Sequence, residues 1–153
     1  MVLNLQLHLE FNATQMIQIV ESPSLMEILG QLYATQVRKN FDLGGRDMFG
    51  GVGTWEPSIR VIIEGGRTLI NTGWLVNSIS PDGAPKLGKG KSGPGGISYK
   101  RGEVSIGTNV KYAKKLAEGY GKLPARPMFD IPEKANENIM KLFALACKRE
   151  LKL

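Results

Sequence analysis

The chain has 153 residues, of which 42% are hydrophobic and 22% charged, which is typical of one domain with its own core. A single cysteine, Cys147, excludes an internal disulfide, and a single histidine, His8, excludes a histidine-rich metal or relay site. No run of about eighteen apolar residues is present, and the formal net charge of +6 suits contact with nucleic acid or with an acidic protein surface.

The first residues alternate apolar and polar side chains. Apolar residues at every second position from Leu3 to Phe11 predict a half-buried strand, with His8 on its solvent-facing side. The start of the chain lacks the basic and apolar pattern of a signal peptide, so we expect synthesis and folding in the cytoplasm.

A helix is predicted from about Ser22 to Asn40. Either Ser22 caps it with Pro23 in the first turn, or Ser24 and Glu27 form a capping box. The apolar stripe of this helix is Leu25, Ile28, Leu29 and Leu32. Two glycines at 44–45 end it, and a glycine-rich loop is expected over 41–54.

The middle of the chain is rich in glycine, and its elements are expected to be short. The β-branched run 58–63 fits a strand or a turn of helix, and the run 68–79 favours a short helix. Residues 81–96 combine glycine, proline and lysine without an apolar run and predict a flexible loop. A β-hairpin over 97–106 turns at Gly102.

Two helices are expected near the C-terminus. The first covers 111–118 and stops at Gly119. An extended connector follows over 121–129, and Asp130 is expected to cap a final helix. The apolar positions of that final helix are Ala135, Ile139, Leu142, Phe143 and Ala146. Together these elements predict a single-domain α+β fold, with a small antiparallel sheet packed by an N-terminal and a C-terminal helix.

The sequence contains no recognisable catalytic constellation. It lacks a Cys/His pair and a G-x-S-x-G motif, and no spacing pairs its carboxylates. The stretch 83–89 matches a phosphate-binding loop until the last position, where Gly90 replaces serine or threonine. Cys147 precedes two basic residues, but its place on the apolar side predicts a packed thiol. We therefore expect no enzyme activity, cofactor, metal site or small-molecule substrate.

Basic residues cluster around the glycine-rich loop. Five of them lie between positions 84 and 101, where no acidic residue occurs. They are Lys86, Lys89, Lys91, Lys100 and Arg101. This stretch fits either a solvated loop or a sequence-independent contact with nucleic acid, whose phosphates flexible lysines bind.

Arg126 is a further interface candidate. Pro124 and Pro127 stiffen the connector on either side of it. A guanidinium held in this way suits a bidentate carboxylate across a fold or subunit contact. The alternative is a surface arginine in a connector. The interface interpretation predicts that Arg126→Ala leaves the purified protein folded.

Four short motifs occur in an order that resembles a known family. They are Trp55-Glu56-Pro57; residues 69–79, which read L-I-N-T-G-W-L-V-N-S-I; residues 104–109 with Tyr112-Ala113; and residues 123–129, which contain P-A-R-P. From about Phe41 onward the chain resembles the phage virion morphogenesis (tail-completion) family of long-tailed, Mu-like phages, and related neck proteins. The residues that the resemblance marks as structural are Trp55, Leu69, Thr72, Gly73, Leu75, Ile79, Tyr112, Pro124 and Pro127.

This resemblance implies a non-enzymatic structural protein of the virion neck or tail. Such a protein is made in the host cytoplasm and completes the tail or joins it to the head. It is expected to form a ring, with six subunits as one option, and to contact neighbouring neck or tail proteins and DNA in the channel. A ring of identical subunits needs two different surfaces on each subunit. A tail terminator is the nearest alternative, and a nucleic-acid-binding protein using residues 84–101 is another. No membrane contact is implied.

Overall fold

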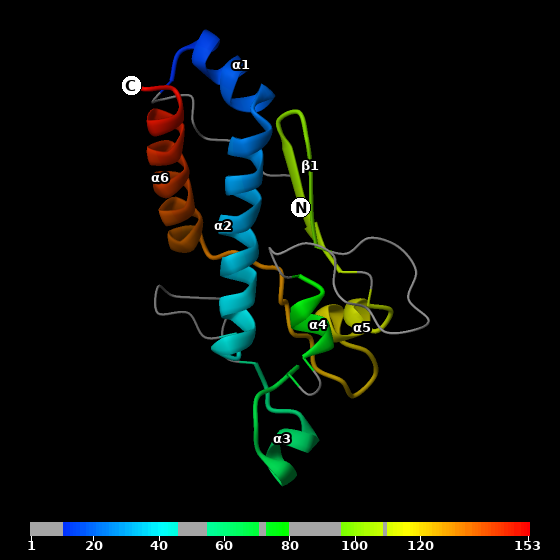
Figure 1. Ribbon diagram of the computed structural model, residues 1–153. Coiled ribbons are helices and arrows are strands. Elements are labelled where there is room, and N and C mark those ends of the chain that lie inside the picture. The colour runs from blue at the N-terminus through cyan, green and yellow to red at the C-terminus, as the bar shows by residue number, and fades with distance from the viewer. Residues whose placement is uncertain (1–10, 46–54, 71–72, 80–95, 109) are drawn as a thin grey trace.

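The computed structural model describes residues 11–45, 55–70, 73–79, 96–108 and 110–153 (Figure 1). The elements are α1 (Ala13–Glu21), α2 (Pro23–Asp42), α3 (Ile59–Glu64), α4 (Trp74–Asn77), β1 (Gly96–Lys100), β2 (Glu103–Gly107), α5 (Ala113–Glu118) and α6 (Glu133–Glu150). The strands form a two-stranded antiparallel sheet. The predicted α+β class is therefore confirmed.

Helix α2 is the centre of the arrangement. It packs against α6 and against both strands of the hairpin, and α1 leads into its N-terminal end (Figure 1). The three short helices α3, α4 and α5 gather towards the opposite end of α2. The predicted strand over residues 3–11 lies outside the described residues, except for Phe11, which is buried.

The chain enters α2 through a helix that the sequence analysis missed. Helix α1 begins with a capping box, in which the Asn12 side chain accepts from the Gln15 amide and the Gln15 side chain accepts from the Asn12 amide, both at 2.9 Å. At the start of α2 the Ser22 hydroxyl accepts from the Leu25 amide at 3.3 Å, and Pro23 occupies the first turn. Of the two predicted caps, the one built on Ser22 is present.

The hairpin packs closely on α2 because of a glycine. A Cβ added to Gly30 would lie 2.5 Å from Cγ2 of Ile97 and 3.2 Å from Cγ1 of Val104. Glycine costs a helix about 1 kcal/mol relative to alanine, and here its lack of a side chain lets both strands approach. The predicted hairpin is confirmed, and the amide of Gly102 in its turn donates to the Val20 carbonyl at 3.2 Å.

The final helix begins later than predicted. Its N-cap is Pro132 rather than Asp130, because a residue that precedes proline is biased towards extended backbone and Ile131 precedes Pro132. The apolar side is also rotated from the prediction. Leu142 is exposed and Ala146 half-buried, whereas Ala144 and Cys147 are buried beside the correctly predicted Ala135, Ile139 and Phe143.

The short elements resolve the ambiguous middle of the chain. The β-branched run after Ser58 is helix α3, and the Ser58 hydroxyl accepts from the Val61 amide at 3.4 Å. The expected short helix within 68–79 is α4, and the one within 111–118 is α5, which begins at Ala113. Of the loop expected over 41–54, the first two residues belong to α2 and residues 46–54 lie outside the described ranges. The loop predicted over 81–96 is described only at Gly96.

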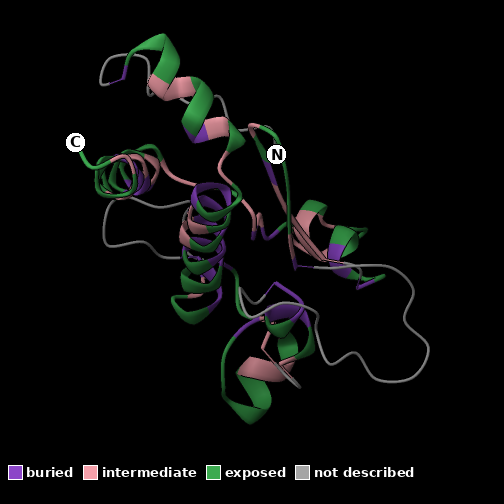
Figure 2. Ribbon diagram, turned by 45° about the horizontal axis from the view of Figure 1, so that its top comes forward, coloured by how far each residue is buried: buried purple, intermediate pink, exposed green. Residues whose placement is uncertain are grey.

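Two hydrophobic clusters form the core, and α2 contributes to both. The upper cluster comprises Phe11, Ile19, Leu25, Met26, Leu29, Tyr33, Val104, Ile139, Phe143, Ala144 and Cys147. The lower cluster comprises Val37, Phe41, Trp55, Leu75, Val76, Ile79, Val110, Ala113 and Met128. Ile106 and Ile131 pack against both clusters. Figure 2 shows the buried residues recurring along α2, which joins the two clusters into one core.

Candidate interaction surface

The four motif segments meet in the lower cluster. Trp55 comes from the first segment, Leu75 and Ile79 from the second, Ala113 from the third and Met128 from the fourth, and all five are buried. Segments separated by up to 73 positions, from Trp55 to Met128, therefore share one core (Figure 1). The marked residues also include Tyr112 just before α5, half-buried Leu69, Pro124 and Pro127, and Gly73, whose left-handed φ of 75° starts α4. Thr72 lies outside the described residues.

Arg126 is buried rather than available at a surface. Its side chain is among the largest that are fully enclosed, with 2% of the residue exposed. Its Nε and Nη2 donate to the Glu56 carbonyl oxygen at 3.2 and 3.0 Å, and its amide donates to the Leu116 carbonyl at 2.9 Å. The predicted place of Arg126 at a carboxylate-binding interface is therefore wrong, because its guanidinium is used inside the chain to join the connector to the first motif, while its backbone amide joins the connector to α5.

Asn40 and Trp55 also tie irregular segments to the lower cluster. The Asn40 amide group donates to the carbonyls of Met128 and Asp130 at 3.1 and 2.9 Å, which fixes the connector against α2. Trp55 packs edge-on against Phe41, with ring centroids 5.6 Å apart. Among the described residues, its buried indole Nε1 has no hydrogen-bond partner. These contacts hold the first and fourth motifs against the end of α2.

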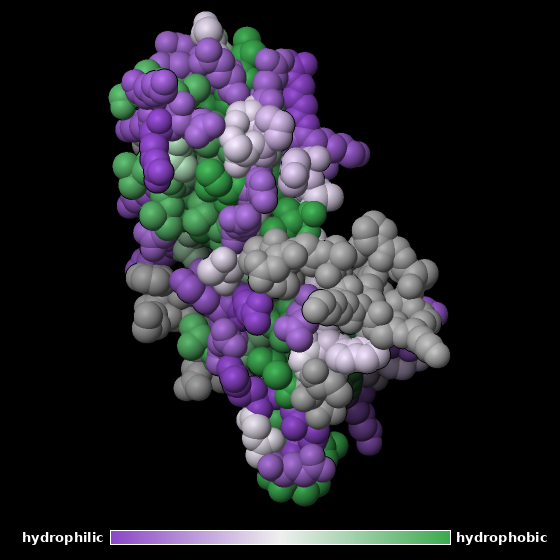
Figure 3. Space-filling view, in the orientation of Figure 1, coloured by the Kyte–Doolittle hydropathy of each residue, from purple (hydrophilic) through white to green (hydrophobic). Residues whose placement is uncertain are grey.

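Helix α3 projects from the lower cluster and is coated with isoleucine. Ile59, Ile62 and Ile63 are 75%, 72% and 75% exposed, and no residue of this helix is buried. Their spacing of i, i+3 and i+4 places them on one face. Figure 3 shows the hydrophobic surface at this free end of the molecule. An apolar face of this kind on a projecting element is typical of a protein contact.

The inner side of α3 is held in place by an arginine. The Arg60 guanidinium donates to the carbonyls of Arg67 and Ile70 at 3.0 and 2.9 Å, and to that of Gly65 at 3.4 Å. Arg67 forms an exposed ion pair with Asp42 at the end of α2, at 2.8 Å. These bonds close the turn after α3 and link it to α2, so the isoleucine face is presented by an anchored helix.

A wide groove lies beside α3. It has a volume of about 700 Å³ and is open to solvent. Its lining comes from the start of α3, the second motif, α5 and the connector: Ser58, Arg60, Leu69, Gly73, Trp74, Leu75, Tyr112, Leu116, Leu123 and Arg126. Trp74 and Tyr112 are about half exposed there. Pockets of about 300–1,000 Å³ commonly bury a drug-sized ligand, so this groove has room for several aliphatic side chains.

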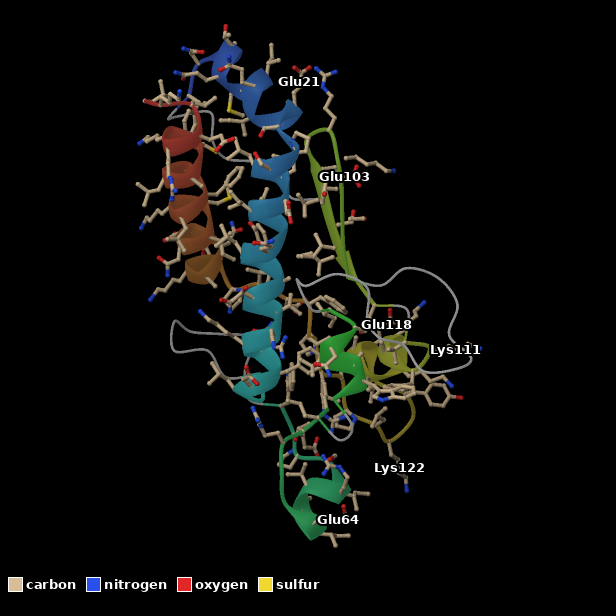
Figure 4. The ribbon with its side chains drawn as sticks, viewed as in Figure 1. Glu21, Glu64, Glu103, Lys111, Glu118 and Lys122 are labelled. Atoms are coloured by element: carbon tan, nitrogen blue, oxygen red, sulfur yellow. The ribbon has the colours of Figure 1, made fainter. Side chains whose placement is uncertain are left out.

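Of the five basic candidates, the two that the structure describes, Lys100 and Arg101, do not line this groove. Lys86, Lys89 and Lys91 lie outside the described residues. Lys100 and Arg101 lie exposed at the hairpin turn, where Arg101 pairs with Glu21 at 2.6 Å at the end of α1 (Figure 4). They line a separate hollow of about 360 Å³ with Val20 and Met26 of the first two helices. These two residues therefore line a different hollow from the groove that Arg126 lines.

Among the described residues, two groups have a shifted pKa, and both belong to the upper cluster. Burial raises the pKa of Tyr33 to about 12 and that of Cys147 to about 11. The Tyr33 hydroxyl bonds to Asn136 of α6, and Cys147 is a packed thiol as predicted. Within the described ranges, no three His, Cys, Asp or Glu side chains are grouped to hold a metal ion, and no helix is long and apolar enough to cross a membrane.

Comparison with known proteins gives no match. No family model, curated protein or solved structure is significantly similar to this chain. What the chain does is therefore argued from the arrangement of its own residues. Two features of the candidate surface went unrecognised in the sequence. The first is the exposed face of α3, because four β-branched residues among the five at 59–63 are also typical of a buried strand. The second is the groove, because its lining comes from four separate segments of the chain.

Proposed function

We propose that this chain is a structural subunit of the neck or tail of a long-tailed phage, acting without catalysis to complete the tail or to join it to the head. The observation that carries the proposal is the convergence of the four motif segments on the lower cluster. Their convergence supports the interpretation that the motif order reflects a common structural unit.

The exposed face of α3 supports an assembly role for that unit. Burying a large aliphatic side chain contributes about 1.5–3 kcal/mol, so three isoleucines that are about three-quarters exposed offer roughly 3–7 kcal/mol before the costs of association. In a subunit that works alone this face would remain in water. In a subunit of a larger assembly it becomes part of an interface.

The proposal is tested by disrupting the gene in the phage that carries it and imaging the lysates by electron microscopy. We expect filled heads beside separate tails of normal length, and restoration of joined particles by the wild-type gene supplied in trans. Tails of abnormal length would instead support a tail terminator. Intact and infectious particles would overturn the proposal.

The nucleic-acid-binding alternative is tested by measuring the affinity of the purified protein for DNA as a function of salt concentration. That alternative requires micromolar binding to DNA at near-physiological salt, and the loss of this binding when Lys86, Lys89 and Lys91 are changed to glutamine. A matched triple variant, Lys114→Gln, Lys141→Gln and Lys148→Gln, removes the same charge from the two C-terminal helices. Equal DNA binding by both triple variants would leave the basic loop without a specific role.

A further inference from the structure

We propose that the groove beside α3 binds the isoleucine face of α3 from a second copy of this chain, so that copies associate head to tail. This inference deepens the proposed function and rests on it, because it names the partner that an assembly subunit would use.

The two surfaces point in different directions from the same helix. On a helix with about 100° between successive residues, Ile59, Ile62 and Ile63 lie within one 100° sector, whereas Arg60 lies outside it. Arg60 lines the groove. The isoleucine face is therefore turned away from the groove of its own chain, and one copy cannot fill its own groove with these side chains. A second copy can.

The chemistry of the groove fits aliphatic side chains. Its exposed walls are Trp74 and Tyr112, with Leu69, Leu116 and Leu123 between them. The donors of its two arginines are directed at carbonyls of their own chain, Arg60 to Ile70 and Arg126 to Glu56. What the groove offers a partner is thus mainly apolar area, which matches what α3 presents.

The charges beside the two surfaces are complementary. Exposed Glu64 ends α3 next to Ile63, and Figure 4 shows it at the free end of the molecule. Exposed Lys111, Lys115 and Lys122 are sequence neighbours of Tyr112, Leu116 and Leu123 in the groove wall, and Lys111 and Lys122 project from that side in the same view. An incoming α3 would bring a carboxylate towards a rim in which these three lysines outnumber the exposed Glu118 of α5, which favours a second copy over a basic partner.

The contact is heterologous, because the surface that each copy gives differs from the surface that it receives. Such contacts extend into a ring when the rotation closes and into an open chain when it does not. The prediction that follows is specific. A copy with an altered α3 face keeps its groove, and a copy with an altered groove keeps its α3 face. These two copies should form a dimer through one contact, and no further copy can add to it.

The experiment is sedimentation velocity on the purified full chain from about 1 to about 200 µM, a range that brackets micromolar affinity. The α3 variant changes Ile59, Ile62 and Ile63 to glutamine, because these positions are exposed and glutamine is compatible with a helix. The groove variants are Trp74→Glu and, separately, Tyr112→Glu. The matched control changes Ile17 and Leu145, exposed on α1 and α6, to glutamine. Circular dichroism establishes that each variant is folded.

We expect the wild type and the control to associate as concentration rises, and the α3 variant and at least one folded groove variant to associate at least about tenfold more weakly. We expect the mixture of the α3 variant with that groove variant to form a dimer and nothing larger. A wild type that stays monomeric throughout would overturn the proposal. An α3 variant that associates like the wild type would also overturn it. In that case the groove would be free to bind a different neck or tail protein.

The same variants separate this inference from the proposed function. If gene disruption leaves heads and tails unjoined but the α3 variant complements fully, the proposed function stands and the groove contact is wrong. If α3 drives association in solution but particles form normally without the gene, the contact stands and the phage role is wrong.

Discussion

The upper and lower clusters are built from different kinds of structure. In the upper cluster, long α2 and α6 and the hairpin satisfy their own backbone groups, and apolar side chains fill the space between them. In the lower cluster the elements that pack around the end of α2 are helices of four to six residues and extended segments. There the fold depends on side chains that bond to distant backbone carbonyls, above all Arg126 and Asn40.

The difference shows how a chain with little regular structure can still form a defined core. Backbone groups that are removed from water need partners, and a short connector cannot supply them to itself. Removing one partner leaves a buried group unsatisfied, which costs more than the bond itself contributes. Single polar side chains should therefore matter more in the lower cluster than in the upper one.

The strongest test is Arg126→Ala. It removes a fully enclosed side chain and leaves the Glu56 carbonyl without its donors, so we expect the free energy of unfolding to fall by about 3–5 kcal/mol. The measurement is urea-induced unfolding followed by circular dichroism. Arg101→Ala is the matched control, because it removes an exposed arginine in an ion pair and should cost less than about 1 kcal/mol. Equal losses in the two variants would contradict the special role of Arg126.

Asn40→Ala tests the second cross-link of the lower cluster. It deprives two carbonyls of the connector of their donor, and we expect a loss of about 2 kcal/mol. Tyr33→Phe is the comparison in the upper cluster, where one hydroxyl bond to Asn136 is lost while the packed ring remains. We expect that change to cost about 1 kcal/mol or less. The reverse order of these two losses would show that the clusters do not differ in the way argued here.

The same contrast explains how far the sequence could predict the fold. The periodic and capping signals of long elements predicted α2, the hairpin and most of the buried side of α6. The start of α6 was misplaced because Asp130 resembles a cap, while Pro132 sets the true boundary. Helix α1 was missed although Asn12 and Gln15 carry the capping-box pattern, which lies directly after the alternating run that drew attention to a strand.

The candidate surface was harder to predict, because its properties are not local. The fate of Arg126 depends on whether a distant carbonyl, that of Glu56, lies within reach. Its flanking prolines indicated a stiff segment correctly but could not indicate which side of that segment faces inward. In the same way, Ile59, Ile62 and Ile63 have the composition of a buried run, and only their place at the end of the molecule exposes them.

A smaller effect is expected where α2 meets the hairpin. Gly30→Ala should gain about 1 kcal/mol of helix propensity but lose more by crowding Ile97, for a net loss of about 1 kcal/mol. In an Ile97→Ala background, which removes the clashing methyl group, the same substitution should stabilise the protein. This reversal of sign in a double-mutant cycle is the measurement. Destabilisation of equal size in both backgrounds would mean that packing against Ile97 is not why α2 carries a glycine here.

The smallest effect concerns the ionisation of Cys147, which changes the free energy of unfolding only at alkaline pH. Burial raises the pKa of Cys147 from 9.0 to about 11 in the folded state, so between these values the unfolded chain releases a proton that the folded chain retains. The free energy of unfolding should therefore be unaffected below about pH 9 and fall as the pH rises towards 11. The free energy of unfolding of the Cys147→Ala variant, measured by urea titration, should fall less over this interval, although ionisation of Tyr33 still contributes above about pH 10.

Because Cys147 belongs to the upper cluster and Trp55 to the lower one, indole fluorescence must report the same midpoint as circular dichroism if α2 makes the two clusters unfold together. Separate midpoints would mean that the clusters differ in cooperativity as well as in construction.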